Sequence, residues 1–220
     1  LGFEKRMLEQ IIRQPDDWVA AIKKLPNNLQ LMTIHALQSV VFNKSLNARI
    51  SANLPISVPV AGDLVGRIDE KGQLDAGSCI LVEDRTLPRI KRNCELGRLT
   101  PTGPLPGSEI SSCQGISGDI EKIVIKEMEL ENANWFIEKI PRLSTKGTRR
   151  ALVTNYGDFH VDTVPIVNDE TLGEKWKKGP SENSRWNPEG ACIRFRFTLS
   201  SGSYATTLLR EFMQCPLEQL

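Results

Sequence analysis

A tyrosine near the C-terminal end of the chain occupies a position at which it could hold a nucleotide base. Tyr204 follows a predicted strand, 193–199, in which apolar residues alternate with arginine and threonine. Ser203 stands where a helix N-cap is expected, so we expect Tyr204 in the first turn of a helix. Free backbone N–H groups favour a phosphate there, and Arg210 is near in the sequence. The alternative is a tyrosine that only packs the corner between strand and helix.

A second candidate surface is an uncharged polar stripe on a helix predicted at about 29–53. The side chains that recur along it every four residues are His35, Ser39, Asn43 and Asn47, and Gln38 lies beside them. Solvated helix faces usually carry Lys and Glu, whereas amides and hydroxyls suit a buried hydrogen-bond network or a surface that reads bases. Both interpretations remain open.

Basic segments supply candidate contacts to RNA phosphates. Residues 141–150 hold four basic residues and no acid, ending in Arg149 and Arg150, and a second basic run spans 85–92. A polar loop at 168–190 interleaves two tryptophans with bases, which are Lys175, Trp176, Lys177, Lys178, Arg185 and Trp186. Such loops can hold single-stranded RNA by stacking and phosphate contact. Ordinary solvated surface is the alternative for each segment.

Composition restricts the possible classes of function. The 220 residues carry a formal net charge of +1, so any nucleic-acid contact must come from local patches. The five cysteines are odd in number and form no Cys-x-x-Cys pair, and there are only two histidines. A zinc site and a disulfide framework are therefore not expected, which fits a reducing cytoplasm. No apolar run is long enough to span a membrane, and no nucleotide, metal or flavin motif is present.

Short periodic segments predict an α+β protein. Residues 3–25 indicate two helices separated at Pro15-Asp16-Asp17, before the long helix at 29–53. Further along, short β-like runs alternate with Gly, Pro and charged turns, and they are 56–60, 78–82, 120–125 and 151–154. The change of texture from about Pro55 to Leu143 predicts a compact inserted domain.

Four segments together resemble the TruD family of tRNA pseudouridine synthases. They are His35-Ala-Leu-Gln-Ser-Val-Val-Phe-Asn43 with Arg49, Pro101-Thr-Gly-Pro-Leu-Pro-Gly107, Gly147-Thr-Arg-Arg150, and Leu199-x-x-Gly-Ser-Tyr-Ala-Thr-x-x-Leu-Arg-Glu211. They follow the family's order, cover nearly the whole chain, and are more similar to archaeal than to bacterial members. Their order, with an inserted domain between the first and the third, makes the resemblance specific.

The resemblance implies a catalytic domain with an antiparallel sheet and flanking helices. Its helical part would be 1–54, the family's insertion domain 55–143, and the C-terminal part of the catalytic domain 144–220. The implied reaction cuts the N1–C1′ bond of the uridine at position thirteen of tRNA, turns the base and rejoins it through C5. This reaction requires neither cofactor nor metal. The resemblance thus implies a cytoplasmic enzyme whose partner is tRNA.

The resemblance also implies roles for individual residues. Tyr204 would stack on the target base; Gln38, Ser39 and Asn43 would line or brace the pocket; Arg149 and Arg150 would meet phosphates; Arg210 would orient an acid. The family's nucleophilic aspartate lies in a Gly-x-Lys-Asp segment that this chain lacks. We therefore expect no catalytic residue here and a partner in the N-terminal half of the same enzyme. The alternatives are a non-catalytic RNA-binding module and a structural protein.

Overall fold

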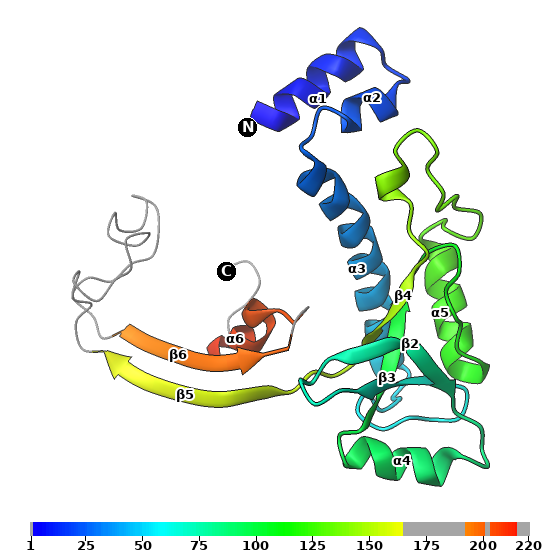
Figure 1. Cartoon of the computed structure of the whole chain (residues 1–220), viewed down its shortest axis with the longest axis vertical. Coiled ribbons are helices and arrows are strands. Elements are labelled where there is room, and N and C mark those ends of the chain that lie inside the picture. The colour runs from blue at the N-terminus through cyan, green and yellow to red at the C-terminus, as the bar shows by residue number, and fades with distance from the viewer. Residues whose placement is uncertain (1, 165–191, 201–202, 215–220) are drawn as a thin grey trace. The chain divides into compact units, whose positions relative to one another are not determined.

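The computed structural model describes residues 2–164, 192–200 and 203–214, and the chain divides into two compact units (Figure 1). Unit 1 comprises Leu1–Val153 and unit 2 comprises Thr154–Leu220. None of the helices described is long and apolar enough to cross a membrane.

Unit 1 begins with two short helices, as the sequence predicts. Helix α1 spans Gly2–Arg13 and α2 spans Trp18–Ile22. The predicted break at Pro15-Asp16-Asp17 is confirmed, because Asp17 caps the second helix: its Oδ1 accepts a hydrogen bond from the Ala20 backbone N–H at 2.9 Å. The proline at position 15 therefore interrupts the helical hydrogen bonds after α1, and Asp17, two residues later, starts α2.

Helix α3, at Asn27–Ser51, is the long helix predicted at about 29–53. Its buried face combines Val41 and Phe42 with polar groups, among them Gln38 and Arg49. It lies against strand β3, Leu99–Leu105, and helix α5, Gly115–Glu127 (Figure 1). A helix that buries amides and a guanidinium needs partners for them, since an unpaired buried polar group costs free energy.

A four-stranded antiparallel sheet forms the centre of unit 1, in the order β2-β1-β3-β4. The strands are β1 Leu64–Ile68, β2 Leu74–Leu81, β3 Leu99–Leu105 and β4 Thr148–Ala151. Helix α4, Leu87–Glu95, packs on it through a core of Val65, Val82 and Ile90. Helix α5 spans Gly115–Glu127, and a 3-10 turn, η1, spans Pro141–Leu143.

Three of the predicted strands differ in the structure, whereas the one at 78–82 is confirmed within β2. Residues 120–125 belong to helix α5, and 56–60 form neither strand nor helix. The expectation at 120–125 was wrong because a short apolar run fits a buried helix as well as a strand. The buried residues of α5 include Ser117 and Val124, which are seven positions apart and so lie on one face of a helix. Strand β4 ends at Ala151, where a strand was expected to begin.

Unit 2 consists of a two-stranded ribbon and one helix. Strands β5, Tyr156–Val164, and β6, Cys192–Leu199, pair antiparallel, and α6 spans Ala205–Met213. The predicted alternation in β6 is confirmed, with Phe195 and Phe197 half-buried between exposed arginines. Phe212 of α6 stacks on Phe159 of β5 at a centroid distance of 4.8 Å, so the helix is joined to the ribbon by aromatic packing.

Candidate functional site

Three of the four segments that carry the resemblance meet in unit 1. Strand β3 contains most of 101–107, and it pairs with β4, which contains Arg149 and Arg150. Helix α3 contributes the first segment and packs on β3. The two glycines Gly107 and Gly147 touch backbone to backbone: a Cβ added to Gly107 would lie 1.9 Å from the Gly147 nitrogen. The segments therefore form one framework, although they are far apart in the sequence.

Gln38 braces this framework. Its side chain is buried, and its Nε2 donates to the Pro106 carbonyl at 2.9 Å and to the Thr145 hydroxyl at 3.2 Å. Both acceptors lie beside the glycine pair, one in each of the two chain segments that meet there. Ser39 is half-buried and Asn43 is exposed, so these two side chains are available at the surface of α3. His35 and Asn47 of the same stripe are exposed as well.

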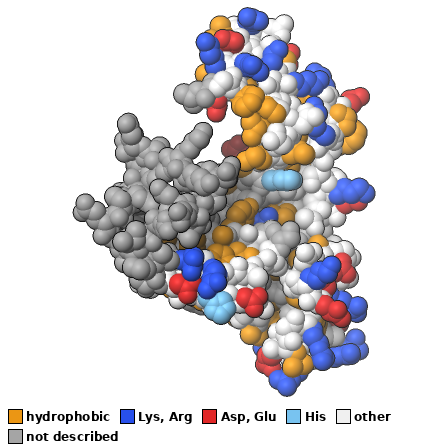
Figure 2. Space-filling model, turned by 60° about the vertical axis from the view of Figure 1, so that its left-hand side comes forward, with side chains coloured by type: hydrophobic (Ala, Val, Ile, Leu, Met, Phe, Trp, Pro, Cys, Tyr) orange, Lys and Arg blue, Asp and Glu red, His pale blue; other side chains and the backbone are white. Residues whose placement is uncertain are grey.

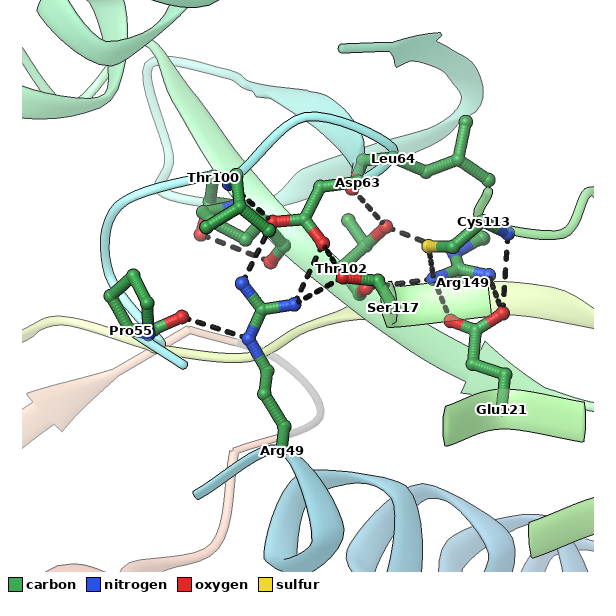
Figure 3. Close-up of polar contacts among 12 residues, drawn as sticks. Arg49, Pro55, Asp63, Leu64, Thr100, Thr102, Cys113, Ser117, Glu121 and Arg149 are labelled. Atoms are coloured by element: carbon green, nitrogen blue, oxygen red, sulfur yellow. Dashed lines mark hydrogen bonds and ion pairs between the residues drawn. The ribbon is translucent and has the colours of Figure 1, made fainter. Parts of the chain in front are cut away.

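Arg149 is buried and holds α5 against the sheet (Figure 3). Its Nη2 donates to Glu121 Oε1 at 2.6 Å and to the Thr102 carbonyl at 2.7 Å, while Nε donates to the Thr102 hydroxyl at 2.9 Å. Burial opposes its charge, but the hydrogen bonds and the charge of Glu121 outweigh this, so the pKa of Arg149 is raised. In this structure the Arg149 guanidinium thus makes an internal ion pair, and its expected contact with a phosphate stays a prediction.

Cys113 shares the surroundings of Arg149. Nη2 of Arg149 lies 3.2 Å from its sulfur, and its backbone N–H donates to Glu121 Oε2 at 3.3 Å. Burial and the nearby Glu121 carboxylate raise the pKa of the Cys113 thiol to about 12. The thiol is therefore neutral at physiological pH and acts as a packing group.

A second buried ion pair joins α3 to the start of β1. Arg49 Nη1 and Nη2 donate to the two oxygens of Asp63, each at 2.7 Å, and Nε donates to the Pro55 carbonyl (Figure 3). The Ser117 hydroxyl and the Val60 N–H donate to the same carboxylate, at 2.6 and 2.8 Å. With both oxygens occupied and 1% of its surface exposed, Asp63 is positioned as a structural anchor and not as a nucleophile.

Sequence reasoning did not predict this pair of networks. Arg49 belongs to the first resembling segment, but nothing in the sequence connected it with Asp63 or Ser117. Ser117 and Glu121 are four residues apart on α5, so both lie on one helix face. Ser117 accepts a hydrogen bond from Arg49, and Glu121 accepts one from Arg149. The spacing of four residues could have predicted a shared polar helix face, but a strand was expected at 120–125.

Arg150 has a different environment from its neighbour. Its guanidinium carbon lies 5.4 Å from the centroid of the Phe42 ring, and its side chain is half-buried. Because successive strand residues point to opposite faces, Arg149 faces α5 while Arg150 lies over α3. Arg150 and the surface residues of α3 are therefore the members of the predicted site that the structure brings together.

Tyr204 and Arg210 lie in unit 2, and their positions differ in part from the expectation. Helix α6 begins at Ala205, so Tyr204 is itself the N-cap, while the Ser203 hydroxyl bonds to those of Thr154 and Ser200. The Tyr204 carbonyl accepts from Thr207 N–H at 3.1 Å, and 58% of the residue is exposed. Arg210 lies in the last turn of α6, at the opposite end of the helix from Tyr204. The aromatic loop expected at 168–190 falls outside the described residues.

Comparisons with known proteins identify the family to which the chain is similar. A family model described as tRNA pseudouridine synthase D (TruD) matches residues 1–212. The chain is 35% identical over 214 residues to a Methanosarcina mazei protein named "Probable tRNA pseudouridine synthase D", and 30% identical over 219 residues to one of the same name from Halobacterium salinarum. Each match covers 97% of this chain, but 44% and 43% of the two relatives. The expected similarity to archaeal members is confirmed.

A solved structure agrees with this assignment. The crystal structure of a Methanosarcina mazei protein described as the "Putative tRNA pseudouridine synthase D (TruD)" superposes on this chain with a TM-score of 0.75 and 33% sequence identity. The superposition covers 100% of this chain and 46% of that one, and it confirms the α+β fold. The chain thus spans less than half the length of the relatives that it matches. On the extent of the family match, the chain belongs to the TruD family of tRNA pseudouridine synthases.

Proposed function

We propose that this chain is the RNA-positioning part of a tRNA pseudouridine synthase, and that the complete enzyme converts the uridine at position thirteen of tRNA to pseudouridine. The observation that carries the proposal is the exposed ring of Tyr204 at the N-terminus of α6, within a segment that resembles the family. With 58% of the residue exposed, Tyr204 presents surface on which a base can stack, which favours this role over corner packing. The proposal places the enzyme in the cytoplasm, with its tRNA substrate.

The reaction is an isomerisation and needs no external reactant. The N1–C1′ bond breaks, the base turns, and a C5–C1′ bond forms; the proton lost from C5 is balanced by the one gained at N1. The target base must leave its stack, at a cost of a few kcal/mol, and stacking on an aromatic side chain returns about 1–3 kcal/mol. Tyr204 would supply this stacking, while Gln38 braces α3 behind Ser39 and Asn43.

The nucleophile would come from the portion of the enzyme that the relatives contain and this sequence does not. Helix α3 offers a surface for that portion: Met32, Val40 and Ile50 are exposed, and of the Lys, Arg, Asp and Glu side chains α3 exposes only Lys44. Figure 2 shows hydrophobic side chains, in orange, midway along unit 1, between ends that carry more Lys, Arg, Asp and Glu side chains. An outward helix face that carries apolar side chains and almost no charge is typical of a face that another part of the protein covers.

The decisive experiment is an assay of pseudouridine formation on unmodified tRNA. We expect no turnover with the 220-residue chain alone, and turnover at position thirteen when the remaining portion of the enzyme is added. Replacing Val40 and Ile50 by Glu should abolish the association of the two portions without unfolding the chain. Turnover by the isolated chain would contradict the proposal and would require one of its own carboxylates as nucleophile. Tight tRNA binding without turnover by the reassembled protein would favour the non-catalytic RNA-binding module.

A further inference from the structure

Unit 1 contains an open groove between α4 and the neighbouring strands, and three arginines line it. The cavity has a volume of about 530 Å³, and its arginines are Arg67, Arg89 and Arg98. Ile68, Ile80 and Leu99 provide an apolar floor between them. No acidic side chain lines this cavity. Figure 1 shows α4 beside the sheet, where it contacts β3.

The three guanidinium groups are unpaired within the described part of the chain. None of them makes an ion pair or a hydrogen bond there, although other exposed cations of unit 1 do, for example Arg92 with Glu95 and Lys146 with Glu109. Asp75 is the cross-strand partner of Arg67, but its Oδ1 accepts the N–H of Gly77 at 3.1 Å. Like charges gathered without counter-charges repel one another, so a binding role explains the arrangement better than stability does.

Local structure holds the arginines in place. Arg89 and Asn93 follow Thr86 at helical spacing along one flank of α4, while Ile90 between them points into the core. The backbone N–H of Arg98 donates to the Asn93 carbonyl at 2.9 Å, and the Arg98 carbonyl accepts from the Ile68 N–H at 3.0 Å. The groove is therefore built from regular elements whose backbones are tied together, and only the ends of its side chains are free to move.

We propose that this groove binds a stretch of the tRNA backbone, as a second RNA contact distinct from Tyr204. The inference rests on the proposed function, since it takes tRNA as the ligand. Guanidinium groups bind phosphate oxygens in pairs, and several of them spaced along an open groove match consecutive phosphates of a chain. The apolar floor suits the sugar and base edges between those phosphates. A protein with a net charge of +1 needs such a concentrated patch to bind RNA at all.

Binding of fluorescent tRNA to the 220-residue chain, measured by anisotropy at several KCl concentrations, tests the groove. The variant Arg67→Gln/Arg89→Gln/Arg98→Gln should raise the Kd at least roughly tenfold at 0.1 M KCl and flatten the log–log salt dependence by about two to three units. The matched control is Lys122→Gln/Arg194→Gln/Arg196→Gln, which removes three cations that are paired with Asp119 or Asp162 and that lie outside the basic segments 85–92 and 141–150. The control should change the slope much less. Circular dichroism and thermal melts verify that both variants are folded.

The other outcomes each decide the matter. Replacing the three arginines by Lys keeps the charge and should restore most of the salt dependence. Equal losses in the groove and control variants would mean that only overall charge matters, and would overturn the proposal. If UMP or inorganic phosphate competes as effectively as tRNA, the groove binds a small anion. If poly-glutamate competes as effectively as tRNA, the groove binds an acidic protein. Either result overturns the proposal that the groove binds tRNA. If the reassembled protein forms no pseudouridine while the groove variant still loses tRNA binding, the proposed function fails and the groove stands.

Discussion

Arg149 and Arg150 are adjacent in the chain, yet their side chains leave β4 on opposite faces of the sheet. Arg149 is 4% exposed and ion-paired to Glu121, whereas Arg150 is half-buried with its guanidinium over the ring of Phe42. The strand pleat separates the two basic residues into a structural one and one that remains near the surface. The resembling segment Gly147-Thr-Arg-Arg150 thus places a packing residue directly before one that we propose contacts RNA.

Replacing Arg149 should destabilise unit 1. Arg149→Ala leaves the Glu121 carboxylate buried without its partner, so we expect the free energy of unfolding to fall by about 3–5 kcal/mol. Urea denaturation followed by circular dichroism measures this. The control is Arg92→Ala, which removes an exposed ion pair and should cost no more than about 1 kcal/mol. Equal small losses for both variants would contradict the structural role of Arg149.

Arg150 should contribute to tRNA binding where Arg149 does not. We expect Arg150→Gln to weaken binding and to flatten the log–log salt dependence by roughly one unit, the value for one lost phosphate contact. Anisotropy titrations at several salt concentrations provide the slope. Lys122→Gln, which removes a cation paired with Asp119, is the control. A slope unchanged from that of the parent chain would mean that Arg150 contacts no phosphate of the tRNA.

Tyr204 should act through its ring face. In the reassembled enzyme, Tyr204→Phe should keep much of the single-turnover rate, while Tyr204→Leu and Tyr204→Ala should lose most of it, since any aromatic offers a stacking surface. With 58% of the residue exposed, the Ala variant should lose clearly less stability than the 3–5 kcal/mol typical of a large buried aromatic. Thermal melts beside the rates separate the two effects, and a fully active Leu variant would end the stacking hypothesis.

The contact between Gly107 and Gly147 should not tolerate a side chain. A Cβ at Gly107 would lie 1.9 Å from the Gly147 nitrogen, and Gly147 has a φ of +80°. We expect Gly107→Ala to lower the free energy of unfolding by roughly 1–3 kcal/mol, as overpacking does. Gly2→Ala is the control, because nothing lies within 4 Å of its added Cβ. Equal stability of the two variants would mean that the backbones separate freely.

The Cys113 thiol should resist alkylation as the pH rises. Burial raises its pKa to about 12 in the folded chain, from an ordinary thiol value of 9.0. Because the folded pKa is raised, the stability that the neutral thiol contributes is fully present below pH 9 and is lost as pH rises toward 12. Iodoacetamide labelling followed by mass spectrometry should show slow modification at pH 9 in the folded chain and rapid modification in urea. Equal rates in both would contradict the buried position.

Periodic segments were predicted well because their signal is local. The alternation of Phe195 and Phe197 with arginines identified β6, and the proline at 15 located the break between α1 and α2. The segment at 120–125 was misread because neighbouring apolar residues do not reveal which partner will cover them. The start of α6 differs by one residue from the expected start. Ser203 does not cap the helix, because its hydroxyl bonds to the Thr154 hydroxyl instead.

The family resemblance, the α+β class and the positions of most helices can be predicted from the sequence, since each depends on residues close together in the chain. The burial of Arg149 against Glu121, the ion pair of Asp63 with Arg49 and the hydrogen bonds of Gln38 to two distant segments arise only when the chain folds. Arg149 meets Glu121 across 28 positions, and Gln38 meets Pro106 across 68. Whether a basic or polar side chain binds RNA or the protein's own carboxylates and carbonyls depends on which groups folding brings within about 3 Å, and no local pattern encodes that distance.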